Sequence, residues 1–128
     1  LRQMPADMVF LGIGENGHLA FNDPHVAFFD DPLIVKVVDL DPACREQQVH
    51  DGCFSRIEEV PTHAMTLTIP VLLDAERLFA IVPTEAKARA IRATCDGPIR
   101  SDCPASILRT HRDATLYIDR GSASLLDR

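Results

Sequence analysis

A glycine-rich stretch near the start of the chain holds the residue types best suited to proton transfer. It reads FLGIGENGHLAFNDP, from Phe10 to Pro24, and places His18 five residues before Asp23. An imidazole exchanges protons near neutral pH, and a nearby carboxylate can hold one ring nitrogen, fix its tautomer and favour its protonated form. The stretch is therefore a candidate for general acid–base catalysis, with a purely structural, hydrogen-bonding histidine as the alternative.

The glycines of this stretch allow a second interpretation. Gly12, Gly14 and Gly17 spell G-x-G-x-x-G after a predicted strand, and Asp39 ends the next predicted strand, close to the ~20-residue separation of a ribose-binding acid. In a dinucleotide site, however, the third glycine opens a helix that faces the pyrophosphate. Two prolines interrupt the segment that follows here, and it has no clean 3.6-residue apolar period. We therefore favour the histidine interpretation.

Apolar segments that alternate with helical ones must position this loop. Strands are expected at residues 7–13, 33–39, 63–69, 77–82 and 114–119. Helices are expected at 42–49, at 84–95 with Thr84 as N-cap, and at 103–111, followed by a helical turn at 120–127. This order predicts an α/β, Rossmann-like fold with a mainly parallel sheet flanked by helices. The loop leaves the carboxyl end of the first strand, where ligands bind in such sheets.

Composition and charge narrow the range of partners. The chain has 128 residues, 46% of them hydrophobic, and a formal net charge of −6. An acidic chain is a poor candidate for binding nucleic acid, whose phosphates require a basic face. No apolar run approaches the roughly 20 residues that cross a bilayer, so we expect no membrane partner.

The four cysteines give no metal signal. They lie at positions 44, 53, 95 and 103, without the C-x-x-C spacing of zinc sites. No secretory signal is recognisable, so we expect free thiols in a cytoplasmic protein. The oligomeric state is left open, with a homo-oligomer as one option.

The motif LGIGENGHLAFNDP resembles the signature loop of the glucosamine-6-phosphate deaminase/isomerase family, approximately L-G-x-G-x-D-G-H-I-A-F-N-E-P. Downstream, VPTHAMTLTIPVLLDAERLFAIVPTEAKARAI is similar to that family's V-P-x-x-A-L-T, its L-L-D-A-E, a strand and a lysine-bearing helix. The resemblance covers most of residues 7–95. The related 6-phosphogluconolactonases share G-x-G-x-D-G-H but continue with T-A-S and F-P, so HLAFNDP lies on the deaminase side.

The resemblance implies conversion of glucosamine 6-phosphate to fructose 6-phosphate and ammonia, without a metal or an organic cofactor. It assigns to His18 the proton transfer at the ring oxygen that opens the sugar ring. It assigns phosphate binding to Lys87, at the start of a predicted helix whose N–H groups also favour an anion. Gly14 and Gly17 would let the backbone approach the sugar phosphate, and Arg45 is a weaker candidate for a second phosphate contact.

Two substitutions depart from the family pattern. Asn16 stands where the family has Asp, and Asp23 stands where it has Glu. We expect Asp23 to orient or charge the imidazole and Asn16 to orient it by a hydrogen bond without supplying charge. Glu15 is the candidate for the missing charge. A shorter acid in a tight site can change the rate by about 10²-fold, so these substitutions bear on activity and on substrate.

Part of the family's active site has no counterpart in this sequence. The Gly-Gly-x-Thr-Pro phosphate loop and an upstream aspartate that shuttles the substrate proton are both missing. Residues 1–128 are therefore expected to form a single α/β segment, the C-terminal half of a longer phosphosugar isomerase/deaminase domain. Two other functions stay open: a 6-phosphogluconolactonase-like hydrolase, and a non-catalytic phosphosugar-binding regulator.

Overall fold

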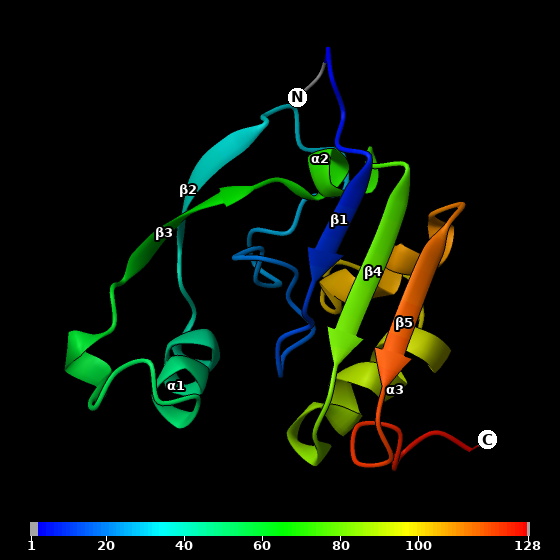
Figure 1. The fold of residues 1–128 in the computed structure, drawn as a ribbon. Coiled ribbons are helices and arrows are strands. Elements are labelled where there is room, and N and C mark those ends of the chain that lie inside the picture. Colours follow the sequence, from blue (N-terminus) through cyan, green and yellow to red (C-terminus); the bar gives the residue numbers. More distant parts are fainter. Residues whose placement is uncertain (1–2, 128) are drawn as a thin grey trace.

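The computed structural model describes residues 3–127 and contains a parallel sheet beside a separate antiparallel ribbon (Figure 1). In the sheet, β4 (Arg77–Val82) is the central strand and pairs in parallel with β1 (Met8–Leu11) and β5 (Ala114–Ile118). The α/β class with a parallel sheet and flanking helices is confirmed. No helix among these residues is both long and apolar enough to cross a membrane.

Two strands that we expected in the parallel sheet lie outside it. β2 (Val35–Asp39) and β3 (His63–Leu67) pair antiparallel with each other and form the ribbon. Between them the chain forms α1 (Pro42–His50) and the 3₁₀ helix η1 (Ile57–Glu59), then returns along β2 instead of crossing the sheet. Strand periodicity indicates which residues share a face but not which strand is the partner, so the sequence prediction was wrong here.

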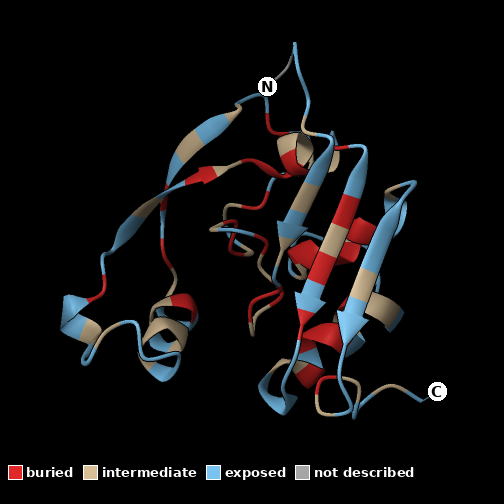
Figure 2. Ribbon diagram, in the orientation of Figure 1, coloured by how far each residue is buried: buried red, intermediate tan, exposed pale blue. Residues whose placement is uncertain are grey.

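The core lies on one face of the sheet. Leu78, Ala80 and Val82 alternate along β4 as buried residues, and α3 (Ala88–Asp96) and η3 (Pro104–Thr110) cover this face (Figure 2). Ile91 of α3 is completely buried in this cluster. The short helix α2 (Ile69–Leu73), which was not predicted, follows β3 and adds Ile69 to the same core.

The predicted helix 84–95 begins differently from the expectation. A 3₁₀ turn, η2 (Glu85–Lys87), precedes α3, and the side chain of Thr84 makes no capping hydrogen bond. Thr84 has φ +81°, a region that suits glycine, because its N–H donates to both carboxylate oxygens of Asp119, at 3.2 and 3.1 Å. Thr84 as N-cap was therefore wrong. Residues 103–111 form a 3₁₀ rather than an α-helix, and residues 120–127 form turns.

Candidate active site

A cavity of about 310 Å³ opens where β1 and β4 end. The loop after β1, helix α1 and the segment after β4 line it with Gly12, Ile13, Gly14, His18, Ala20, Gln47, Ile81, Val82, Pro83 and Lys87. His18 and Lys87, which are far apart in the sequence, therefore share one cavity. Its place agrees with the rule that ligands bind beyond the carboxyl ends of parallel strands.

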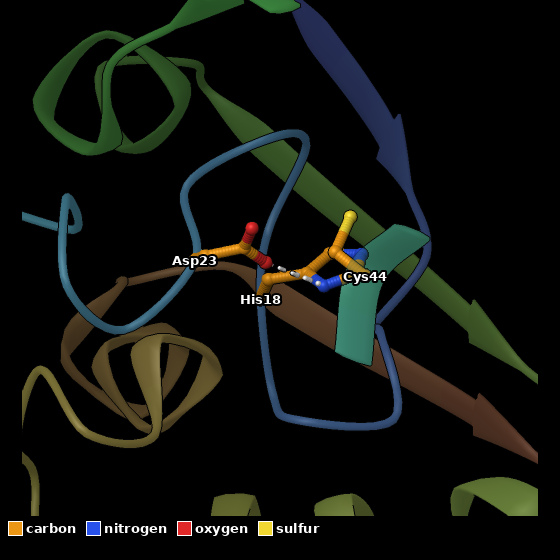
Figure 3. Close-up of side chains that lie close together, drawn as sticks. All are labelled: His18, Asp23 and Cys44. Atoms are coloured by element: carbon orange, nitrogen blue, oxygen red, sulfur yellow. Dashed lines mark ion pairs between the residues drawn. The ribbon is translucent and has the colours of Figure 1, made fainter. Parts of the chain in front are cut away.

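The imidazole of His18 is held through one of its two nitrogens. Its Nδ1 lies 2.7 Å from Oδ1 of Asn16. The same nitrogen lies 3.1 Å from Oδ1 of Asp23 (Figure 3). Asp23 is completely buried, and the His18 side chain is 14% exposed. Nε2 has no hydrogen-bond partner among the described residues, so this nitrogen is available to a molecule in the cavity.

Two glycines make room for this arrangement. A Cβ atom on Gly14 would lie 2.1 Å from Cε1 of His18 and 2.3 Å from both of its ring nitrogens. Gly17 has φ +83°, and a Cβ there would lie 2.9 Å from Sγ of Cys103. Gly14 is thus needed to seat the imidazole and Gly17 to make the turn, whatever part either plays in binding a substrate.

Hydrogen bonds hold Asp23 in its ionised form. Burial alone would raise the pKa of this carboxyl, but hydrogen bonds from His18, the backbone N–H of Asp41 and Asn16 outweigh burial and lower it. The backbone contact is 3.1 Å long, from Asp41 N to Oδ2 of Asp23. A buried carboxylate beside an imidazole stabilises the imidazolium form, which is the role expected for Asp23.

Asp41 is a member of this cluster that sequence reasoning missed. Its Oδ2 accepts a 2.9 Å hydrogen bond from Nδ2 of Asn16, and its Oδ1 accepts a 2.7 Å bond from the N–H of Cys44 as the N-cap of α1. An Asp-Pro pair at the start of a helix predicts such a cap. Its contact with Asn16 depends on how α1 packs against the loop, which no local pattern encodes.

Glu15 and Arg45 do not occupy the positions expected of them. The carboxylate of Glu15 forms no ion pair within the described part of the chain, and its backbone N–H donates to Oε1 of Gln47 at 3.0 Å. The acid next to Asn16 is Asp41 instead. Arg45 does not line the cavity, because its Nη2 donates to the carbonyls of Ile57 and Val60, at 2.8 and 3.0 Å, and braces the segment after α1.

Lys87 brings a positive charge to the cavity. It ends η2, one residue before α3 begins, and its side chain is half-buried. No carboxylate among residues 3–127 forms an ion pair with its ammonium group. An ammonium without a protein counter-ion in a cavity is suited to an anionic ligand such as a phosphate.

Two groups of side chains near this site have the atom types that metals bind. His18, Asp23 and Cys44 (Figure 3), and likewise Asp23, His25 and Asp41, place one ligand atom each within 4.8 Å of one another. Burial, followed by the charges of Asp23 and Asp41, raises the pKa of the Cys44 thiol to about 12, so the free thiol stays protonated. Hydrogen bonds already engage both oxygens of Asp23. The chemistry of the cluster is therefore that of a hydrogen-bond network.

The sequence was compared with models of known protein families. The sequence model of the glucosamine-6-phosphate isomerases/6-phosphogluconolactonase family matches residues 1–117. The chain belongs to this family. The resemblance seen in the loop motif is thereby confirmed, and the cavity with His18 and Lys87 lies within the matched residues.

Individual relatives narrow the comparison to one branch of the family. A glucosamine-6-phosphate deaminase of Exiguobacterium sibiricum is 38% identical over 126 residues, which are 98% of this chain and 48% of the relative. One of Listeria welshimeri is 40% identical over 126 residues, which are 98% of this chain and 52% of the relative. The chain thus spans about half the length of the curated relatives it matches.

Solved structures of the family share the fold. A monomeric glucosamine-6-phosphate deaminase superposes with a TM-score of 0.86 at 38% identity, covering 93% of this chain and 47% of that protein. A 6-phosphogluconolactonase from Leishmania guyanensis superposes with a TM-score of 0.70 at 24% identity, covering 97% of this chain and 43% of that protein. The second likeness supports the fold alone.

Proposed function

We propose that this chain carries part of the active site of a glucosamine-6-phosphate deaminase. The enzyme would convert an amino-sugar phosphate and water to a ketose phosphate and ammonia. The observation that carries the proposal is the imidazole of His18, held by Asn16 and Asp23, in one cavity with the ammonium of Lys87, which has no ion-pair partner among residues 3–127. Curated relatives at 38–40% identity are named as deaminases, which supports this activity over a lactonase.

Each side chain has a definite part in the proposed reaction. Nε2 of His18 exchanges a proton with the ring oxygen as the sugar ring opens, while the buried carboxylate of Asp23 stabilises the imidazolium. Lys87 holds the phosphate and so fixes the sugar relative to the imidazole. These proton transfers need no metal or organic cofactor.

Two further parts of the family's active site have no counterpart among these 128 residues. We assign the phosphate loop and the proton-shuttling aspartate to the part of the family fold that these 128 residues do not span. Turnover would then require that part. A cytoplasmic location and a homo-oligomer both stay predictions.

The deciding experiment uses the protein in its full natural length, with glucosamine 6-phosphate as substrate and both ammonia and fructose 6-phosphate as readouts. We expect equal amounts of the two products, and a loss of at least about 10²-fold in kcat for His18→Ala. Lys87→Met should raise KM, whereas Arg89→Met, an exposed cation of α3 outside the cavity, should leave it unchanged.

Three results would refute the proposal. Binding of the sugar phosphate without any ammonia would point to a regulator that keeps the pocket and lacks the chemistry. Release of an acid from a phosphorylated sugar lactone, abolished by His18→Ala, would point to a lactonase. Unchanged turnover in His18→Ala would remove this histidine from the mechanism.

A further inference from the structure

The side-chain amide of Asn16 lies between two acids and a histidine. Its Nδ2 lies 2.9 Å from Oδ2 of Asp41 and 3.2 Å from Oδ1 of Asp23. Carboxylate oxygens only accept hydrogen bonds, so the nitrogen end of the amide must face the acids. The oxygen end then faces His18, where it accepts from the backbone N–H at 3.1 Å. The orientation of the amide is thus fixed from both ends.

This orientation, together with the carboxylate of Asp23 at 3.1 Å from Nδ1, determines the tautomer of the imidazole. The same Oδ1 of Asn16 lies 2.7 Å from Nδ1 of His18, and because it only accepts, Nδ1 must carry a proton. A neutral imidazole has a single ring proton, so Nε2 then has a free lone pair. His18 is therefore poised as a base at Nε2, the nitrogen that has no partner within the described residues.

We propose that Asp41 is a positioning residue that sets the tautomer of His18 through the amide of Asn16. Its two oxygens have separate partners, since Oδ1 caps α1 at the N–H of Cys44 and Oδ2 anchors Asn16. An amide at position 41 has a single oxygen and could satisfy only one of these donors. A carboxylate is thus required by the geometry. The consequence for turnover rests on the proposed function, whereas the tautomer does not.

The same geometry explains why an amide suits position 16. A carboxylate there would lie within 3.2 Å of Asp23 and 2.9 Å of Asp41, so three negative charges would meet in a largely buried cluster. Like charges at such distances raise one another's pKa values and favour uptake of a proton. Asn16 avoids this, because it donates to both acids and still accepts from His18.

Other titratable groups around the imidazole are few. Lys87 lines the same cavity, and Cys44 stays a neutral thiol because burial raises its pKa to about 12. His25 is exposed, with a ring nitrogen within 4.8 Å of carboxylate oxygens of Asp23 and Asp41. His25→Gln removes a second imidazole near the cluster, so it is the background for the NMR measurements.

The test is the tautomer of His18, measured by ¹⁵N NMR of the imidazole nitrogens above the pKa of the ring. In the parent protein we expect the Nδ1–H form. In Asp41→Asn the new amide keeps its oxygen on the Cys44 N–H and turns its NH₂ group toward Nδ2 of Asn16, so the Asn16 amide loses one of its anchors. The fraction of the Nε2–H form should therefore rise, while the carboxylate of Asp23, 3.1 Å from Nδ1, still favours the Nδ1–H form. Asn caps helices as well as Asp does, so α1 is retained. Asp51→Asn, at the other end of α1, should keep the parent tautomer.

Kinetics supply a second readout that a purely structural role would not produce. Asp41→Asn should lower kcat about tenfold with little change in KM, since general acid–base catalysis contributes 10²–10⁴-fold in total. The double variant Asn16→Asp/Asp41→Asn exchanges acid and amide, and should restore the Nδ1–H form and part of kcat.

An unchanged tautomer and kcat in Asp41→Asn would overturn the proposal, as would an equal change in Asp51→Asn. Should Asp41→Asn not fold, Asp41→Ser decides, because serine also caps helices but brings no carboxylate to Asn16: a larger Nε2–H fraction supports the proposal, and the parent tautomer refutes it. The NMR measurement needs no substrate. A protein that shows the expected tautomers but releases no ammonia would therefore refute the deaminase proposal and leave the role of Asp41 intact.

Discussion

At the scale of single residues, the site depends on the missing side chain of Gly14. A Cβ at this position would lie 2.1 Å from the imidazole of His18, closer than any van der Waals contact allows. Gly14→Ala must therefore push the ring away from Asn16 and Asp23. We expect kcat for ammonia release to fall about 10²-fold, because general acid–base catalysis tolerates little misplacement. ¹H NMR should also show a shifted His18 resonance in the absence of substrate.

Gly12→Ala is the matched control for this prediction. A Cβ on Gly12 meets nothing closer than the carbonyl oxygen of Ile81, at 3.9 Å, which is an ordinary contact. This variant should keep the parent His18 resonance in the absence of substrate. If both alanine variants behave alike, space at Gly14 does not position the ring.

Single residues were also where the sequence was most informative. Glycine spacing and the histidine-to-acid interval located His18, Asn16, Asp23 and Gly14 in one loop, because a loop brings neighbours in sequence together in space. Asp41 was not found, because its role depends on the packing of α1 against that loop. Arg45 was misjudged for the same reason, since its carbonyl partners follow α1 in the chain.

At the scale of elements, an ion pair ties the segment before β2 to that strand. Lys36 of β2 lies 2.6 Å from Oδ2 of Asp31 and also donates to the carbonyl of Val26, with its ammonium 4.7 Å from the ring centre of Phe28. The two charged side chains are 10% and 4% exposed. Asp31→Asn leaves the ammonium without its counter-ion, which should lower the free energy of unfolding by about 3 kcal/mol at pH 7.

The pH dependence of this loss follows from the pKa of Asp31. The hydrogen bond from Lys36 lowers that pKa despite burial, so the ionised form is favoured in the folded state. The stabilisation is complete above the unfolded pKa, near 4, and disappears as the pH falls through the lower folded value. Denaturant unfolding should thus show parent and Asp31→Asn converging in acid. Asp30→Asn, an exposed neighbour, should change stability by less than about 0.5 kcal/mol throughout, and a pH-independent loss in Asp31→Asn would contradict the assignment.

Elements were predictable where local signals decide them. The strand at residues 77–82 and the helix that begins at Pro42 have the predicted positions, because apolar alternation and an N-terminal proline are local properties. The start of α3 could not be predicted, because the carboxylate of Asp119 holds the backbone of Thr84 in a conformation that threonine disfavours. The pairing of β2 with β3 in the ribbon could not be predicted either, because it depends on segments that are far apart in the sequence.

At the scale of the whole molecule, two separate cores meet at the loop that carries His18. The larger core lies under the sheet and includes Leu19, which is completely buried. Within the described part of the chain, the buried residues of the smaller one are Val38, Leu40 and Cys44, with Phe21 packed against it. The loop therefore contributes a residue to each core.

The smaller core should open before the molecule unfolds, because few apolar contacts hold it. Cys44 reports this opening, since its thiol is buried and its pKa is raised to about 12, whereas Cys53 is exposed. In peptide-resolved thiol labelling at pH 8, Cys53 should react at once. Cys44 should react only through a local opening whose free energy is smaller than that of global unfolding. That opening moves the first turn of α1, so it also withdraws Asp41 from Asn16. Labelling of Cys44 as fast as Cys53, or only at the global unfolding rate, would show that the two cores are not independent.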